Sequence, residues 1–496
     1  MFSSILAKIR QVLTKVGLLK NIQSVADVTD IPIDDSYYSM IDMWLCIYKG
    51  FYGDWHNVSY HTIDGPRNRK MDTMKMGKIV SEEMARLVFN EKVNINISPN
   101  EYSDNIHNVL NKNNFNKMFQ DYLEYMFGLG GMAIKTYAEL NKEGNYEICL
   151  NYVTADCFIP LSYSNKGINE GIFVNITKKG KYYYTLLEFH VWNGLEYNIK
   201  NELYQSETSY ELGIKVNLSM LYPNLEEITT IKGLTRPLFV YFKPNIANNI
   251  DLTSPLGIPL FANALDTLKS LDTAFDSFHR EFRLGKKRII VPATAIKTIV
   301  DPTDGCVKRY FDASDETYQA FSFTDMENQK IVDNSVELRV DEHISAINSL
   351  LDILSMQTGF SAGSFTFDGM QVKTATEVIS EQSKTFRTKN SHEIIIEEGL
   401  KELITTIGEV AELYDLFSVP ADVEVSIDFD DSIVVDKDAD KNYYLSLYTQ
   451  KLTSKKYTLM KILKLTEEEA DEMIQQVNED QATLTNDIEG VFGGGG

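Results

Sequence analysis

The sequence predicts an α+β fold, and three parts of the chain carry the evidence. Apolar residues recur at helical spacing in residues 71–127, whereas residues 132–245 alternate apolar and polar side chains as strands do. Helical spacing returns at residue 254 and continues, with interruptions, to residue 416. The chain has 496 residues. Because one hydrophobic core rarely grows that large, we expect roughly two to four domains or an elongated subunit of several parts.

The charge balance argues against tight binding to nucleic acid. The formal net charge is −23, and proteins that hold DNA phosphates normally do so with Lys and Arg. Acidity does not exclude DNA as a neighbour, because a surface that lets DNA slide past should repel it.

Cysteine usage and hydropathy exclude further classes. Cys46, Cys149, Cys157 and Cys306 form no CxxC pair, so we expect neither a zinc site nor a disulfide framework, and a reducing compartment fits. No apolar run reaches the length needed to cross a membrane. Residues 1–22 have an amphipathic pattern that favours a helix docked on protein, with a helix on a membrane surface as the alternative.

The first half of the chain predicts helices followed by a β-meander. Residues 71–90 and 101–127 each carry apolar residues at helical spacing, and the glycines of GLGG at 128–131 end the second region. From 132 to about 245 we predict antiparallel strands. The turns Lys179-Gly180 and Asn193-Gly194 punctuate these strands, and Asn-Gly is a strong hairpin signal.

The second half predicts three long helices. Ser254-Pro255 reads as a helix start, and apolar residues continue at three- and four-residue steps to residue 284. Such a rod would be about 45 Å long. A mixed segment at 286–338 precedes a second helix at 339–358, for which Gly359 is a C-terminal cap. A third helix, 374–416, begins with a capping box at Thr374–Glu377.

The loop at 359–373, GFSAGSFTFDGMQVK, joins two of these helices and is unusual in composition. It has three glycines and three phenylalanines but little charge. One interpretation is that it faces something large that moves past it. The other is an ordinary loop held down by its own phenylalanines. Downstream, short helices are predicted at 441–450, 454–463 and 467–479, and the terminal GGGG is a flexible tail or an expression scar.

A search for catalytic and ligand-binding motifs finds little. GLGG lacks the spacing and context of a nucleotide-binding loop, and His56 and His61 are a weak metal signal. The basic cluster Lys286, Lys287 and Arg288 reads as a helix end, with phosphate contact as the alternative. We therefore expect a structural protein with no enzymatic activity, no cofactor and no metal site.

The order of these elements resembles that of a known family, the portal proteins of tailed bacteriophages, in particular of long-tailed phages. The resemblance covers nearly the whole chain. No single stretch is a signature, but together and in this order they are fairly specific. The best-matching stretches are SEEMARLVFNE, GLGGMAIKTY, YVTADCFIP, YYYTLLEFH, SPLGIPLFANALDTLKSLD and KTATEVISEQSKTFRTKNSHE.

The resemblance implies a portal-like subunit in a ring oligomer, typically twelve-fold, at one capsid vertex. The ring would be the channel for DNA packaging and ejection. The implied parts are an α/β wing, two long stem helices, a small α/β clip, a tunnel loop, a long helix spanning the wing, and a helical crown with a flexible tail. They would occupy, in this order, residues 1–250, 251–285 with 339–358, 286–338, 359–373, 374–416 and 417–496.

The resemblance also implies site residues and partners. Residues of the tunnel loop would face DNA: Phe365, Phe367, Asp368, Gly369, Met370, Gln371, Val372 and Lys373. Residues of the clip would contact the terminase motor or a head-tail connector protein: Lys286, Lys287, Arg288, Lys308 and Arg309. Further implied partners are major capsid and scaffolding proteins, and double-stranded DNA bound without sequence specificity. The protein would belong to the virion, be assembled in the host cytoplasm, and not bind membranes.

Two other readings remain open at this point. The chain could be another structural component of the phage head, such as a connector or minor capsid protein, which would lack a moving loop in the channel. It could also be a nucleic-acid-processing enzyme, although this would require a catalytic motif that the sequence does not show.

Overall fold

The computed structural model describes most of the chain, apart from its two ends and several internal segments, chiefly within 286–336 and at 368–382. Side chains between 286 and 336 are not described. Backbone or full descriptions cover residues 35–62, 65–90, 92–209, 212–285, 288–290, 297–300, 307–310, 332–334, 337–367, 383–429, 437–463 and 470–477 without 472. The amphipathic segment 1–22 and the terminal glycines therefore lie outside the described residues.

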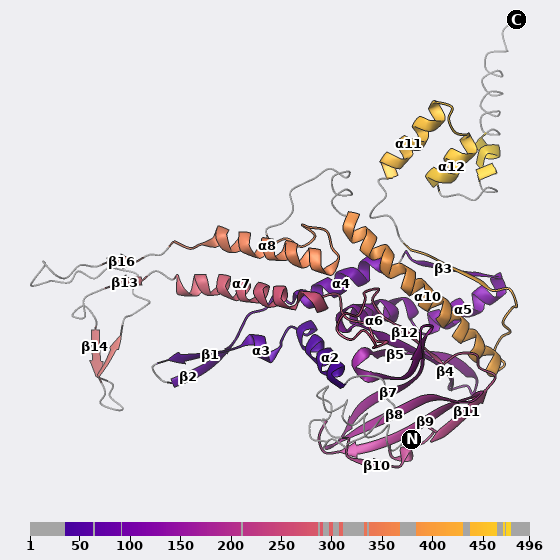
Figure 1. Cartoon of the computed structure of the whole chain (residues 1–496), viewed down its shortest axis with the longest axis horizontal. Coiled ribbons are helices and arrows are strands. Elements are labelled where there is room, and N and C mark those ends of the chain that lie inside the picture. The colour runs from indigo at the N-terminus through magenta and orange to yellow at the C-terminus, as the bar shows by residue number, and fades with distance from the viewer. Residues whose placement is uncertain are drawn as a thin grey trace, which may run out of the picture.

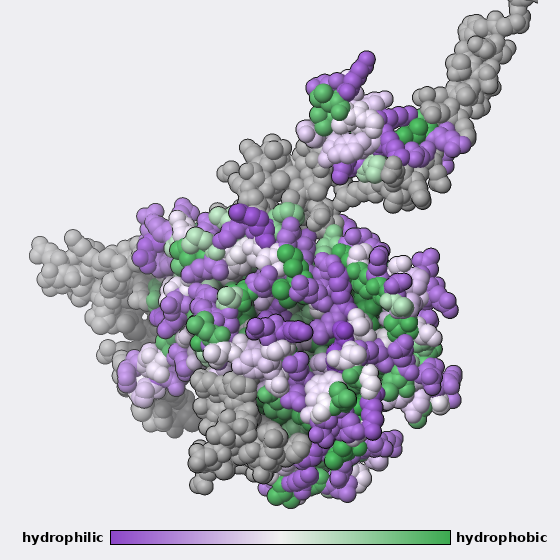
Figure 2. Space-filling model, turned by 45° about the vertical axis from the view of Figure 1, so that its right-hand side comes forward, coloured by the Kyte–Doolittle hydropathy of each residue, from purple (hydrophilic) through white to green (hydrophobic). Residues whose placement is uncertain are grey.

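Figure 1 shows an α/β body from which two long helices, α7 and α8, project side by side. The short strands β13, β14 and β16 lie beyond the far ends of these helices, and the small helices α11 and α12 stand apart from the body. On the face in Figure 2, apolar side chains are scattered among polar ones. This mixture of helices and sheets agrees with the α+β class that the sequence predicts.

The helices of the body form around aromatic and aliphatic side chains. They are α2 (Asp35–Tyr48), α3 (Gly53–His56), α4 (Met76–Val88), α5 (Asn100–Lys112) and α6 (Phe115–Leu129). The helical region expected at 101–127 is thus two helices. Asn114 separates them with a left-handed backbone conformation (φ 50°), which Asn adopts more readily than most residues.

The expected antiparallel meander is confirmed, although its strands divide between two sheets. One sheet has the order β12-β4-β5, and the other has the order β10-β9-β8-β7-β6 with β11 also paired to β9. Gly180 and Gly194 occupy the predicted hairpin turns. The strands are β4 (Met132–Leu140), β5 (Tyr146–Thr154), β6 (Phe158–Ser164), β7 (Gly167–Lys179), β8 (Tyr182–Asn193), β9 (Glu196–Ser206), β10 (Ile214–Val216), β11 (Ile228–Lys232) and β12 (Phe239–Phe242).

Two further strand pairs flank the body. β1 (Asn57–Thr62) and β2 (Gly65–Lys70) form a hairpin that lies beside α7 in Figure 1. β3 (Asn94–Ser98) pairs with β17 (Glu424–Asp428), so a strand from the C-terminal part of the chain completes the N-terminal part.

The first of the long helices begins later than the sequence predicts. α7 runs from Leu265 to Leu284, after a short 3₁₀ turn at Ala262–Ala264, whereas we expected a start at Ser254. Pro259 would lack the amide donor of a helix interior. The segment before α7 bonds to the body instead, since Leu260 N donates to Phe127 O at 3.0 Å and Tyr37 Oη donates to Gly257 O at 2.6 Å.

α8 (Val340–Thr358) agrees with the second predicted helix and runs antiparallel to α7. Thr267 Oγ1 donates to Gln357 Oε1 (2.8 Å) at the body end. Arg339 Nη2 donates to Glu281 Oε2 (3.0 Å) at the other end. Gly359 caps α8 in the left-handed region (φ 89°), as the sequence predicts.

The third long helix crosses the body. α10 is described from Ser383 to Leu413, and it packs over β12, β4 and α4. The predicted capping box at Thr374–Glu377 lies outside the described residues. The second half of α10 is apolar on one side, and its buried residues include Ile396, Leu400, Leu403, Ile404, Ile407 and Val410. Beyond β17, α11 (Lys437–Thr449) and α12 (Lys455–Leu463) confirm two predicted short helices.

Candidate functional site

The loop after α8 begins with a polar clamp to α10. Thr388 Oγ1 donates to the carbonyl of Gly359 (2.8 Å). Ser361 N donates to Thr385 Oγ1 (2.8 Å), and the two hydroxyls lie 3.2 Å apart. Ser361 and Thr385 are buried, where a satisfied hydrogen bond matters most. The clamp therefore fixes the start of the loop to α10.

The described part of the loop then folds back along α8. Gly363 N donates to Asp352 Oδ1, and Phe367 N donates to Asn348 Oδ1, each at 2.8 Å. Asn348 and Asp352 are four residues apart on one face of α8, so the loop follows this face toward the far end of the helix pair. Sequence reasoning missed both acceptors, although their spacing places them together on one helix face.

The phenylalanines of the described loop pack on their own subunit. The Phe365 ring lies 5.0 Å from the ring of buried Phe360. The Phe367 ring lies 5.7 Å from Phe278 and 6.3 Å from Phe275 of α7. Phe365 and Phe367 are half-buried, and aromatic pairs at such distances are stabilising. The other residues predicted to face DNA lie outside the described residues: Asp368, Gly369, Met370, Gln371, Val372 and Lys373.

The structure describes the backbones of three of the five predicted clip residues. Arg288 is in β13 (Arg288–Ile290), which pairs with β16 (Val332–Asn334). Lys308 and Arg309 are in β15 (Val307–Tyr310), which pairs with β14 (Lys297–Val300). Lys286 and Lys287 lie outside the described residues.

A second polar cluster, which sequence reasoning missed, joins the β1–β2 hairpin region to α7. Asp272 accepts from Met74 N (2.8 Å) and lies 3.0 Å from His56 Nε2. Asp276 holds Arg69 through two bonds of 2.6 Å. The Arg69 guanidinium keeps the pKa of the Asp276 carboxyl below its usual range. We call these four residues, His56, Arg69, Asp272 and Asp276, the stem-base cluster.

The stem-base cluster also changes the interpretation of His56. His56 Nδ1 lies 2.8 Å from Tyr52 N and 3.0 Å from Tyr52 O, and its Nε2 faces Asp272. His56 is buried. Its ring nitrogens therefore contact Tyr52 and Asp272 within the fold. Among the described residues, no group of three or more His, Cys, Asp or Glu side chains could hold a metal ion.

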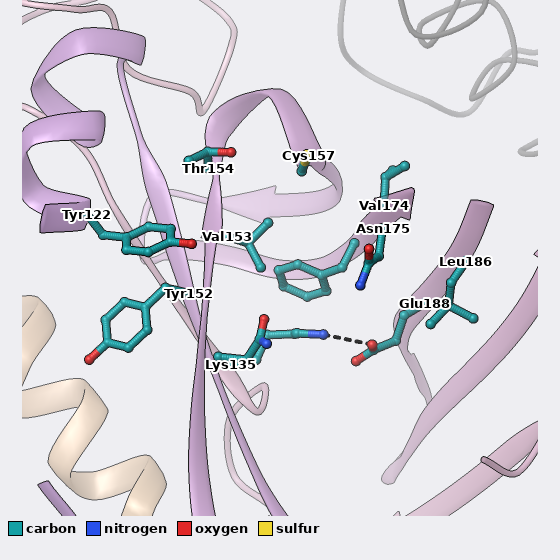
Figure 3. Close-up of a pocket in the computed structure, with 12 residues that line it drawn as sticks. Tyr122, Lys135, Tyr152, Val153, Thr154, Cys157, Val174, Asn175, Leu186 and Glu188 are labelled. Carbon is teal, nitrogen blue, oxygen red and sulfur yellow. Dashed lines mark hydrogen bonds and ion pairs between the residues drawn. The ribbon is translucent and has the colours of Figure 1, made fainter. Parts of the chain in front are cut away.

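Figure 3 shows a further charged pair in the interior, beside a cavity of about 280 Å³ between the two sheets. Lys135 Nζ of β4 donates to Glu188 Oε2 of β8 at 2.7 Å, and His190 Nε2 lies 2.6 Å from Glu188 Oε1. Burial favours the neutral carboxyl, but Lys135 and His190 outweigh it and hold the pKa of Glu188 below its usual range. Burial lowers the pKa of His190. This pairing links the sheets and leaves no free acid or base among the three.

Comparison with known proteins shows the family to which the chain belongs. The family model "Phage portal protein, SPP1 Gp6-like" matches residues 29–484. The match covers nearly the whole chain and makes it one of the phage portal proteins. Within this class, the chain belongs to the SPP1 Gp6-like family. No curated protein matches the sequence significantly.

Membership confirms the resemblance that the sequence indicates. As a phage portal protein, the chain is a structural protein of the capsid vertex and acts in DNA packaging. Where helices are described, none combines the length and apolarity that a bilayer crossing requires.

The clamp gives a testable consequence for loop glycines. Gly359 and Gly363 both have positive φ (89° and 76°), so Ala at either position costs about 1 kcal/mol in backbone strain. At Gly359 an added Cβ would also lie 2.6 Å from Thr388 Cγ2, whereas nothing lies within 4 Å at Gly363. We expect Gly359→Ala to lower the thermal unfolding midpoint clearly more than the matched control Gly363→Ala. Equal shifts would contradict the clamp.

Proposed function

We propose that copies of this chain form a ring, with α7 and α8 as the stem around a channel through which DNA is packaged and ejected. The family match over residues 29–484 carries this proposal. The antiparallel α7–α8 pair supports it, because it projects from the body as a rod and both helices keep exposed residues for contact with neighbouring copies.

The loop of residues 359–373 is the tunnel loop in this proposal. Its described part meets α8 through backbone amides and packs phenylalanines on α7, without a cation. The side chains of this described part are uncharged, so its contacts to a passing duplex would be weak and independent of base sequence, which suits sliding. The proposed DNA-facing residues are Phe365 and Phe367 together with residues 368–373.

The segment 286–338 is the clip, with Lys286, Lys287, Arg288, Lys308 and Arg309 as candidate contacts for the terminase motor or a connector protein. ATP hydrolysis belongs to the terminase in this scheme, and the portal chain itself is not an enzyme. The body would be the wing that meets major capsid and scaffolding proteins, and assembly takes place in the host cytoplasm before the ring becomes part of the virion. Residues 417–496 would form the crown.

The proposal predicts rings of about a dozen chains with a central hole. Native mass spectrometry of the purified protein gives the subunit number, and electron-microscope class averages give the symmetry. A stable monomer or dimer at high concentration would overturn the ring. Sustained ATP turnover by the purified chain would overturn its assignment as a structural subunit.

A further inference from the structure

We propose that one face of α7 in each copy docks against one face of α8 in the next copy, in a register set by a single charge pair, Arg280 with Glu342. The inference rests on the proposed ring, because the occupant of each face is a second copy of this chain. It adds which surfaces meet, which residues face each other, and why the assembly closes.

The first step is the relative height of residues on the two helices within one copy. Three contacts give it: Thr267 with Gln357 (2.8 Å), the Phe278 and His343 rings (5.9 Å), and Glu281 with Arg339 (3.0 Å). Because the helices are antiparallel, each step of one residue toward higher numbers on α7 matches a step of one residue toward lower numbers on α8. This places Arg280 level with Glu342, to within about one helical turn.

The second step is the exposed face of each helix. On α7, residues three and four apart form a face turned away from α8: Asp266, Ser270, Thr273, Ser277, Arg280 and Leu284. Of these, Arg280 borders the stem-base cluster, where its charge acts on the Asp276 carboxyl. On α8, the corresponding face is turned away from the buried side chains Ile347, Leu351 and Leu354, and consists of Glu342, Ser345, Ser349, Ile353 and Met356. We call these the α7 outer face and the α8 outer face.

The two outer faces match at successive heights. Arg280 is level with Glu342, Ser277 with Ser345, Thr273 with Ser349, and Ser270 with Ile353 by the register above. A rotation about an axis parallel to the stem would bring these residues together across two copies. Since a rotation without translation keeps heights unchanged, matching at equal heights favours a closed ring over an open helical filament.

The middle of both faces carries small side chains, and most of their hydroxyls already donate a hydrogen bond within their own helix. Ser270, Thr273 and Ser277 each donate to the carbonyl four residues back, at 2.8 Å. Ser349 does the same at 2.9 Å. These hydroxyls therefore need no partner from outside, and small side chains let two helices approach closely.

The residues near the ends of the two outer faces would attract neighbouring copies and fix their register. Arg280 and Glu342 are exposed and opposite in charge, and complementary charges fix the register of an interface. Ile353 and Met356 are 42% and 62% exposed, whereas Ile347, Leu351 and Leu354 on the opposite side of α8 are buried. Burial of Ile353 against Ser270 of the next copy would remove apolar area from water, whereas Met356 lies level with Asp266 by the same register.

A charge-swap experiment on the full chain tests the pair. Arg280→Glu should raise the concentration at which half the chains are in rings by about tenfold or more, because two carboxylates then face each other. Glu342→Arg should do the same, and the double swap should restore assembly. The control is Arg283→Glu, which makes the same charge change about 100° around α7 from the α7 outer face.

Disulfide trapping tests the register directly. Ser277→Cys with Ser345→Cys should give a ladder of covalent multimers on oxidation, because facing small residues can meet disulfide geometry. Ser277→Cys with Asn348→Cys, which points toward the loop, should give none, nor should either single variant. A bridge within one chain is not expected, since the two outer faces of one copy point away from each other, and it would give no ladder.

The outcomes separate this inference from the proposed function. Wild-type rings without a ladder, and without rescue by the double swap, would overturn the inference and leave the ring standing. Absence of wild-type rings would overturn both. A ladder that ends at the mass of the ring, together with rescue, supports the inference.

Discussion

A portal that lacks residues 364–370 is expected to assemble into rings and fail to package DNA. The shortened loop keeps Ser361, so the clamp to Thr385 and Thr388 remains and the helix pair should stay intact. It loses Phe365 and Phe367 and the segment proposed to meet the duplex. The measurement is the amount of DNA protected from nuclease after packaging into empty capsids by terminase.

A length-matched control separates the side chains from the length of the loop. Replacement of residues 364–370 by Gly and Ser keeps the span but removes the phenylalanines. If the replacement packages normally while the deletion fails, the loop acts through its length alone. If both package at the wild-type rate, the assignment of this segment as a tunnel loop is wrong. Rings must be verified by mass spectrometry in each case.

The second large effect is expected at the stem-base cluster. Both oxygens of Asp272 accept, one from Met74 N and one from His56 Nε2. An amide has only one acceptor oxygen, so Asp272→Asn leaves one donor without an acceptor. That donor is Met74 N, or it is Tyr52 N if the His56 ring changes tautomer and Nδ1 donates to Tyr52 O. The cost of the unsatisfied buried group is about 2 kcal/mol. Amides of the β1–β2 hairpin should therefore exchange hydrogen roughly thirtyfold faster, if they exchange through local opening.

The control for this variant is Glu83→Gln, an exposed position on α4 with the same change of charge. It should leave exchange of the hairpin within experimental error. Exchange that rises equally across the whole body in Asp272→Asn would mean that the cluster stabilises the fold globally and does not hold the hairpin on α7.

The sequence predicts those parts of the fold that local chemistry decides. Gly359 ends α8 because a left-handed cap favours glycine, and Gly180 and Gly194 turn strands at the expected places. The start of α7 could not be predicted in the same way. Ser254-Pro255 has the form of a helix start, but the segment after it forms tertiary bonds to Phe127 and Tyr37 that override the local signal.

In the candidate site, too, local features can be predicted from the sequence and distant contacts cannot. The glycines and phenylalanines of the loop stand out in the sequence, and so does the basic cluster at the end of α7. The partners that hold the loop and the hairpin do not. His56 meets Asp272 across 216 residues, and Arg69 meets Asp276 across 207. No periodicity or spacing in one sequence specifies which distant residues will meet.

The pairing of β3 with β17 has a consequence for synthesis of the chain. Residues 94–98 find their partner strand only when residues 424–428 have left the ribosome, and α10 covers β12 and β4 just before that. Contacts between residues so far apart in the sequence form late in folding. A nascent chain that ends before residue 424 therefore cannot form the β3–β17 pair. A subunit truncated before residue 424 therefore lacks the partner strand of β3 and leaves that strand edge unpaired.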